Sequence, residues 1–223
     1  MAPETIVDRA LELGFSIIGI TDHNSTRQCG IVHEIGREKG LTVLCGVELT
    51  TREEVHLLAW FESPAVAMAF QGWIDTHLQK VPNNPDFFGH QVVVDRQEQV
   101  VYEEPNLLIT ALDTDVLESA SAVQAFGGIA ACAHLDKRKN SLFSQLGMMP
   151  KGLMLNAGEV ASPSSAKKVL GQLGERALPI LCGSDAHVIE DLGKGETHFD
   201  LHAPTFQEVR LALLGIEGRK VRI

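Results

Sequence analysis

Short apolar segments alternate with amphipathic segments along most of the chain. Helical spacing of apolar residues predicts helices over residues 3–13, 27–39, 64–80, 113–126, 141–148, 163–173 and 205–214. Strand-like apolar runs fall at residues 15–20, 41–49, 54–61, 127–134, 151–158 and 178–185. The runs 41–49 and 54–61 are close enough in sequence to form a hairpin. Strands that alternate with helices indicate an α/β barrel or an open, largely parallel sheet.

Residues 81–106 interrupt this alternation. The segment VPNNPDFFGHQ is rich in turn residues, and QVVVDRQEQVVYEE has the pattern of a small hairpin or an irregular insertion. The rest of the chain contains no internal repeat, low-complexity tract or clear linker. We therefore expect a single domain over residues 1–223, with an insertion at about 81–106.

Four of the predicted strands end in an acid or a histidine. The residues at these ends are Asp22, His23, Glu48, His134, Asp185 and His187. Because active sites form where the carboxyl ends of parallel strands share one face, we expect these side chains to converge. His56 begins the strand after Glu48, and a hairpin would return it to that face or to the opposite one, depending on the register.

This combination of residue types suits borderline or hard divalent metals such as zinc, manganese or iron. Three histidines and three carboxylates exceed the needs of one ion, so we expect two or three ions with Glu48 as a bridging ligand. Taken singly, a histidine at a strand end is more often structural, and Asp22 or Asp185 could cap a helix. The joint pattern at four strand ends favours a metal site.

The composition narrows the class of partner. With 19 basic and 29 acidic residues, the chain has a formal net charge of −10, which makes it a poor binder of polyanions. A nucleic acid is therefore not expected as the main partner. The apolar runs are strand-sized, so no membrane span is expected, and the first residues read as a capped helix instead of a signal peptide.

The four cysteines are Cys29, Cys45, Cys132 and Cys182, and none forms a C-x-x-C pair. The last three lie within apolar runs, which is typical of buried, reduced thiols. We therefore expect no disulfide and a cytoplasmic location.

The motifs ITDHNS, GVE, an H-L-L strand, AH, and GSDAH followed by LG occur in this order from the start of the chain to about residue 195. This arrangement resembles the PHP (polymerase and histidinol phosphatase) family. The resemblance implies a distorted seven-stranded, TIM-like β/α barrel with a di- or trinuclear metal centre that hydrolyses phosphate esters.

The resemblance also implies a role for each residue. His23 and His187 correspond to ligands of an outlying metal, Glu48 to the bridging carboxylate, His56 and His134 to ligands of the second metal, and Asp185 to a ligand of the first. Asp22 belongs to the motif and would orient a ligand.

One feature of the family pattern is missing from this chain. Members begin with a strand that carries His-x-His, whereas this sequence starts on what resembles the following helix. We expect N-terminal truncation, with loss of the motif as the alternative. The first metal would then retain only Glu48 and Asp185. The barrel would then lack its first strand and have an open edge. Dimerisation or a borrowed strand could cover this edge, so a homo-oligomer is one expectation.

The favoured hypothesis is a metal-dependent phosphoesterase that acts on a small phosphorylated metabolite or nucleotide through an activated water. His134, His23 or Asp22 would assist proton transfer. Lys137 and Arg138 are expected to bind the substrate phosphate, with a solvated basic loop as the alternative. Two other hypotheses remain open, namely a non-catalytic metal-binding or regulatory module and an amidohydrolase-type metal hydrolase.

Overall fold

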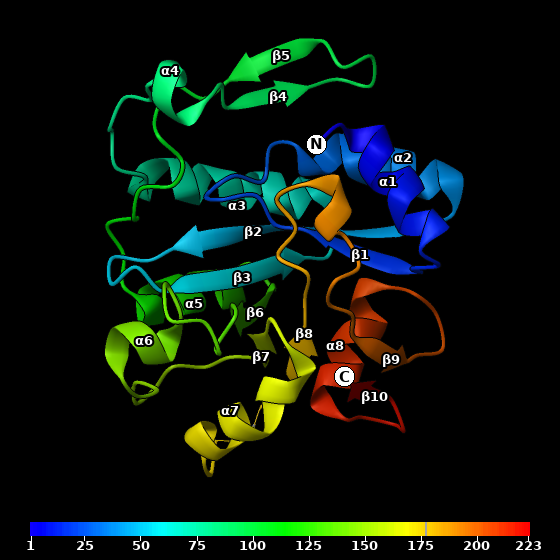
Figure 1. The fold of residues 1–223 in the computed structure, drawn as a ribbon, viewed down its shortest axis with the longest axis vertical. Coiled ribbons are helices and arrows are strands. Elements are labelled where there is room, and N and C mark those ends of the chain that lie inside the picture. The colour runs from blue at the N-terminus through cyan, green and yellow to red at the C-terminus, as the bar shows by residue number, and fades with distance from the viewer. Residues whose placement is uncertain (177) are drawn as a thin grey trace.

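A curled six-stranded sheet forms the centre of the computed structural model, which describes residues 1–176 and 178–223 (Figure 1). The strands, in their order across the sheet, are β1 (Ile17–Ile20), β2 (Thr42–Thr50), β3 (His56–Phe61), β6 (Ile129–Cys132), β7 (Ala157–Val160) and β8 (Ile180–Cys182). Strand β3 runs antiparallel to both of its neighbours, and the other pairs are parallel. The predicted hairpin between the second and third strands is therefore confirmed.

The expected seven-stranded barrel is not confirmed. Over the described residues, β1 and β8 are the edges of this sheet, and each pairs with one strand of it. The fold is a mixed α/β fold with a curled half-barrel. The alternation of strands and helices predicted the class, but closure depends on a pairing between edges that the pattern of apolar residues does not encode.

The helices lie on both faces of the sheet. They are α1 (Pro3–Glu12), α2 (Cys29–Lys39), α3 (Pro64–His77), α4 (Pro85–Phe88), α5 (Val116–Ala125), α6 (Leu142–Leu146), α7 (Ala166–Leu173) and α8 (Phe206–Leu214), with 3₁₀ turns at Pro163–Ser165 and Ile189–Asp191. Helices α1, α2 and α3 lie along one side of β1 and β2 (Figure 1). None of the described helices is long and apolar enough to cross a membrane.

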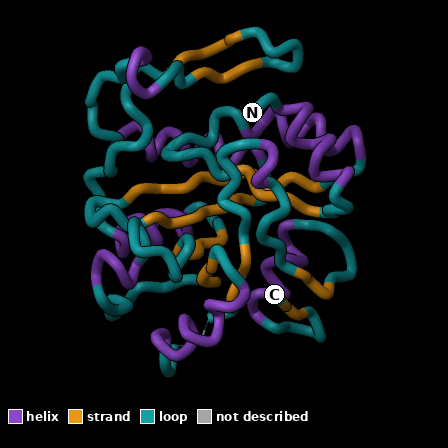
Figure 2. The backbone as a smooth tube through the Cα atoms, viewed as in Figure 1, coloured by secondary structure: helices purple, strands orange, loops and turns teal. Residues whose placement is uncertain are grey.

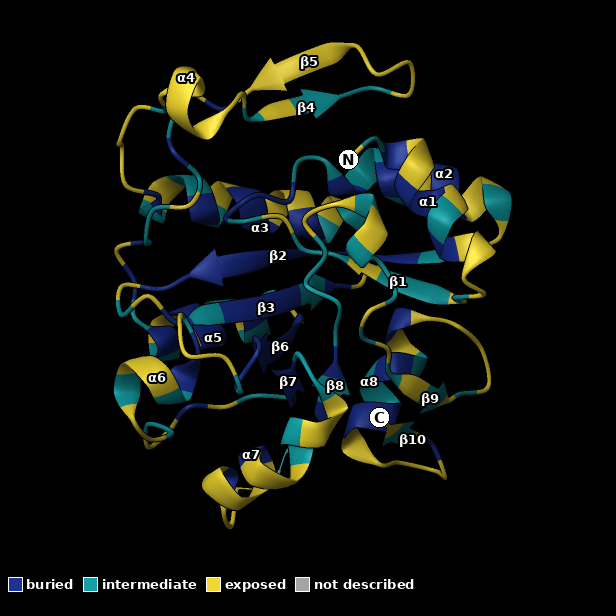
Figure 3. Cartoon of the chain, viewed as in Figure 1, coloured by how far each residue is buried: buried dark blue, intermediate teal, exposed yellow. Residues whose placement is uncertain are grey.

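The two faces of the sheet bury different apolar clusters. The larger cluster includes Val47, Leu57 and Cys132, and packs under α3 and α5. We call the opposite face the inner face. It carries Leu44, Leu58, Ile129, Ala131 and Ala157, and α8 covers it with Phe206, Val209 and Leu213. Strands β2 and β3 are mostly buried on both faces (Figure 3), which explains their nearly continuous apolar sequence.

The insertion contains the predicted hairpin, formed by β4 (Val92–Val94) and β5 (Val100–Glu103). Long loops connect it with α3 and α5 (Figure 2). The Gln28 side chain anchors it, because its amide accepts a hydrogen bond from Val94 N and donates one to Val94 O. The guanidinium of Arg27 also lies 4.8 Å from the centre of the Tyr102 ring. The insertion is thus attached to the loop that follows β1.

The strand predicted at residues 151–158 is misplaced. Residues 151–156 form a turn and a loop, and β7 begins only at Ala157. Gly152 has a φ of 88°, a left-handed conformation that no strand uses. The short strands β9 (His198–Asp200) and β10 (Lys220–Arg222), which form an antiparallel pair, were not predicted.

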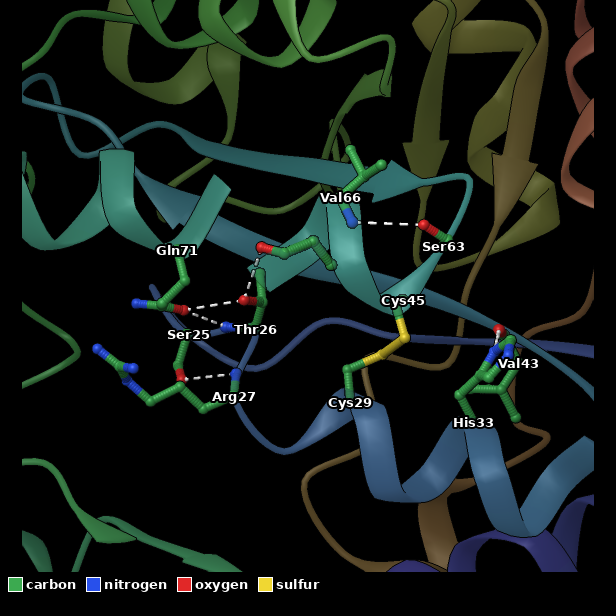
Figure 4. Close-up of a disulfide and its surroundings, with 11 residues drawn as sticks. Ser25, Thr26, Arg27, Cys29, His33, Val43, Cys45, Ser63, Val66 and Gln71 are labelled. Atoms are coloured by element: carbon green, nitrogen blue, oxygen red, sulfur yellow. Dashed lines mark hydrogen bonds between the residues drawn. A yellow bond between two sulfur atoms is a disulfide. The ribbon is translucent and has the colours of Figure 1, made fainter. Parts of the chain in front are cut away.

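The expectation of no disulfide is wrong. Cys29 and Cys45 form a disulfide with a Cα–Cα distance of 5.4 Å, which joins the start of α2 to the middle of β2 (Figure 4). Both residues are 1% exposed, whereas Cys132 and Cys182 are free and buried. The helix–strand packing that brings the two sulfurs together is tertiary, so sequence spacing did not reveal it. The cysteines therefore no longer support the predicted cytoplasmic location.

We expect the double substitution Cys29→Ser and Cys45→Ser to lower the free energy of unfolding by about 3 kcal/mol, since the disulfide closes a loop of this size in the unfolded chain. Urea denaturation under non-oxidising conditions would measure the change, with Cys182→Ser as the control. Four reactive thiols in the unreduced, unfolded wild-type protein would contradict the disulfide.

Candidate metal centre

Backbone pairing beyond the end of β1 places His23 beside Glu48. Glu48 N donates to Asp22 O at 3.1 Å, and Asn24 N donates to Glu48 O at 2.9 Å. The buried Asn24 has a φ of 46°, and its amide accepts from Thr50 N and donates to two carbonyls of the loop at 107–111. The side chain of Asn24 therefore holds the loop that carries His23 in this position.

The register of the β2–β3 hairpin decides the position of His56. Thr50 pairs with His56 and Glu48 pairs with Leu58, so Glu48 and His56 share the inner face. Because β3 runs antiparallel to β2, the first residue of β3 lies beside the last residues of β2, at the same end of the two strands. This settles the face that the sequence left open.

His134 follows the end of β6 and is 4% exposed. Ala133 N donates to His56 O at 3.1 Å, so the pairing with β3 continues up to this residue. His134 itself has a φ of 29°, a left-handed conformation that is unfavourable for a residue with a side chain. The turn directs the imidazole towards Glu48.

The carboxylate of Glu48 lies among three imidazoles. His56 Nδ1 is 3.0 Å and His134 Nε2 is 3.3 Å from Glu48 Oε1, and His23 Nδ1 is 3.3 Å from Glu48 Oε2. The nitrogens of His56 and His134 are 3.2 Å apart. Both oxygens of one buried carboxylate are thus shared among three histidines.

Burial and hydrogen bonding act in opposite directions on Glu48. Burial alone would raise the pKa of this carboxyl, but hydrogen bonds with His134 and His56 outweigh it and hold the pKa well below its usual value. For His23, burial lowers the pKa of the imidazole, and the charge of Glu48 opposes this effect only in part. The site therefore favours an ionised carboxylate beside a neutral imidazole, the protonation states that bind a metal.

Unpaired nitrogens support a metal at this position. Within the described part of the chain, the buried Nδ1 atom of His134 has no hydrogen-bond partner, and His23 Nδ1 makes no hydrogen bond although it lies 3.3 Å from Glu48 Oε2. Ligand atoms of His23, Glu48 and His56 all lie within 4.8 Å of one another. Unpartnered imidazole nitrogens beside an ionised carboxylate fit a divalent cation well.

The remaining predicted ligands lie beside this group. The rings of His187 and His23 are 5.9 Å apart, and His187 is exposed. Asp185, at a φ of 49°, forms an ion pair with Lys137, so the predicted phosphate-binding lysine contacts a predicted metal ligand instead. Arg138 is exposed on the same loop. Asp22 is also exposed, and the structure does not bring its carboxylate into the cluster around Glu48.

Glu159 was missed by the sequence analysis. It lies on the inner face of β7, is 9% exposed, and accepts a hydrogen bond from His134 N through Oε2 at 3.2 Å. The predicted strand ended at Gly158, so Glu159 was not recognised as an acid near a strand end. The segment AGEV, an acid in an apolar run before ASPSS, was the available signal. Burial raises the pKa of Glu159 to about 7.

Comparisons with known proteins agree with the motifs. Residues 168–214 match the family described as PHP-associated (PHP_C). No curated protein gave a significant match.

Three solved structures share the fold. Endonuclease Q from Pyrococcus furiosus, a lesion-specific endonuclease, has a TM-score of 0.72 at 17% identity, over 98% of this chain and 52% of that one. A protein from Bifidobacterium adolescentis, with a suggested metal-dependent phosphoesterase activity, has a TM-score of 0.61 at 19% identity, over 96% and 90%. An amidohydrolase from Chromobacterium violaceum, solved with sulfate and no metal, has a TM-score of 0.59 at 17% identity, over 96% and 92%.

The chain thus has the fold of this group of proteins, and it spans about half the length of the endonuclease. The match over residues 168–214 agrees with the predicted resemblance to the PHP family, and the solved structures show that the chain shares their fold.

We expect Glu159 to make the stability of the metal-free protein pH-dependent. Its folded-state pKa of about 7 lies above the usual 4.5, so the folded state binds the proton more tightly and stability falls as the pH rises from about 4.5 to above 7. The loss should be on the order of 3 kcal/mol. Urea denaturation in a chelator at pH 5 and pH 8 should show that the wild type loses more stability than Glu159→Gln by about this amount, since the contribution of His23 is common to both proteins. Equal losses in both proteins would contradict it.

Proposed function

We propose that this chain carries the site of a metal-dependent hydrolase that cleaves phosphoesters. One observation carries the proposal: the buried, ionised carboxylate of Glu48 contacts three imidazoles at one end of the strands of a PHP-like sheet. These imidazoles belong to His23, His56 and His134. The likeness to a suggested metal-dependent phosphoesterase over 90% of that chain supports the reaction class.

Four residues would hold one ion or a pair of ions at the cluster around Glu48, namely His23, Glu48, His56 and His134. Asp185 and His187 would complete the binding of a second or third ion, once Lys137 has released Asp185. Nitrogen and carboxylate ligands in this proportion suit zinc, manganese or iron. Glu48, with both oxygens directed at histidines, is the natural bridging ligand.

Divalent ions supply Lewis-acid chemistry at such sites, by polarising a phosphoryl oxygen and lowering the pKa of a water. The side chains of the chain would provide the remaining functions. Lys137 and Arg138 lie on the exposed loop after His134, where they can bind the phosphate and offset its charge. His134 and His23 serve as ligands in this proposal, and Asp22 lies outside the cluster around Glu48, so the leaving group would take its proton from solvent.

The charge of the chain favours a small substrate. A net charge of −10 repels a polyanion, so we propose a phosphorylated metabolite or a nucleotide. The likeness to endonuclease Q makes damaged DNA the nucleic acid to test against this proposal. The amidohydrolase neighbour likewise keeps amide hydrolysis as a second candidate. A metal-binding module without activity is the third.

We expect Glu48→Gln to weaken binding of Mn²⁺ or Zn²⁺ at least tenfold, because the amide removes the charge that the imidazoles share. Metal content after gel filtration, measured by elemental analysis, and calorimetric titration would test this. Glu53→Gln is the matched control, because among the described residues this carboxylate accepts a hydrogen bond from Val116 N and contacts no histidine of the site. Equal metal content in both variants would exclude the site.

We expect the double substitution Lys137→Ala and Arg138→Ala to lower kcat/KM for phosphoesters ten- to hundredfold, mainly through KM, since binding of the phosphate is lost. Steady-state kinetics on aryl phosphates, nucleotides, an abasic-site DNA duplex and aryl amides would measure the change. Lys139→Ala, on the same exposed loop, is the control. Hydrolysis of the amides alone would reverse the assignment, and metal binding without any turnover would favour the binding module.

A further inference from the structure

Glu159 binds two successive backbone amides of the segment that carries His134. Its side-chain Oε2 accepts from His134 N at 3.2 Å, and its backbone carbonyl accepts from Leu135 N at 2.7 Å. The regular ladder between β6 and β7 ends before this point, at the pair of Cys132 and Gly158. Two hydrogen bonds to Glu159 therefore take the place of the regular ladder at the turn that carries the His134 imidazole.

The conformation of His134 needs this support. With a φ of 29°, the backbone of His134 is in a region that costs free energy for a residue with a side chain. Such a conformation persists only where neighbouring groups hold it, and a buried amide without an acceptor would add a further cost. The carboxylate of Glu159 provides that acceptor for the 4%-exposed His134.

The same carboxylate is packed tightly against the segment that leads to Asp185. A Cβ atom on Gly183 would lie 2.0 Å from Glu159 Oε1, so a side chain at this position would have to displace the Glu159 carboxylate. Gly183 follows β8 and precedes Asp185 by two residues. One oxygen of Glu159 thus binds the His134 turn, and the other abuts the start of the Asp185 segment.

We propose that Glu159 is a positioning residue, whose carboxylate, held between the His134 amide and Gly183, sets the distance between the imidazole of His134 and the carboxylate of Asp185. This inference rests on the proposed metal site, since it assigns the spacing of two of its ligands. Glu159 acts through the backbone and not as a ligand. Residues that orient ligands in this way typically change metal affinity 10- to 100-fold when they are removed.

The first test separates the positioning role from a general contribution to stability. Glu159→Ala should weaken Mn²⁺ binding at least tenfold, whereas Glu159→Gln, which keeps an oxygen acceptor, should stay within about threefold of the wild type. Asn156→Ala is the matched control. Asn156 Oδ1 accepts from Ala130 N at the other end of the same two strands, so this variant loses a similar hydrogen bond far from the ligands.

Hydrogen exchange of the metal-free proteins gives an independent readout. The His134 amide should exchange at least tenfold faster in Glu159→Ala than in the wild type, and at an unchanged rate in Glu159→Gln and Asn156→Ala. If the wild type binds no metal, the proposed function fails, but this measurement still tests the hold on His134. Equal metal affinities and equal exchange rates in all three variants would overturn the inference.

The second test uses the contact with Gly183. Gly183→Ala should weaken Mn²⁺ binding at least tenfold in the wild type, because the new methyl group displaces the carboxylate. In the Glu159→Ala background, Gly183→Ala should weaken Mn²⁺ binding less than threefold, since the carboxylate that the methyl group would meet is then absent. Additive effects of the two substitutions would show that the two residues act independently, and would also overturn the inference.

Discussion

The antiparallel register of β2 and β3 is the constraint on which the whole site depends. It places Glu48 and His56 on the inner face, and it brings β6 alongside so that His134 ends next to them. A slip of one residue would move His56 to the opposite face and leave the charge of Glu48 without its shortest partner. The buried apolar residues on both faces of β2 and β3 stabilise this register.

Three residues in the left-handed region surround the site, namely Asn24, His134 and Asp185. Each follows a strand end, at a point where the chain turns. The side chain of Asn24 binds three backbone groups, and Glu159 binds the amide of His134. Backbone strain near the ligands is thus offset by buried hydrogen bonds from residues that would not touch a metal.

The ion pair between Lys137 and Asp185 links the two halves of the site. In the proposed function Asp185 binds an additional ion and Lys137 binds the phosphate, so neither residue can act in its proposed role while the two are paired. Binding of metal at Asp185 would release Lys137 for the substrate. This arrangement gives a physical reason for metal and substrate to bind in a coupled manner, although each group alone is a common surface feature.

The sequence by itself determined the position of five of the six sheet strands and the candidate metal ligands at their ends. Apolar runs interrupted by Asp, Glu and His are local signals, and they sufficed to indicate the α/β class and to pick out His23, Glu48 and His134. Only the tertiary structure decided the face of His56, the role of Glu159, the disulfide between Cys29 and Cys45, and the open form of the sheet. These features depend on pairing between segments distant in sequence, and local periodicity does not encode the register or the packing distance between them.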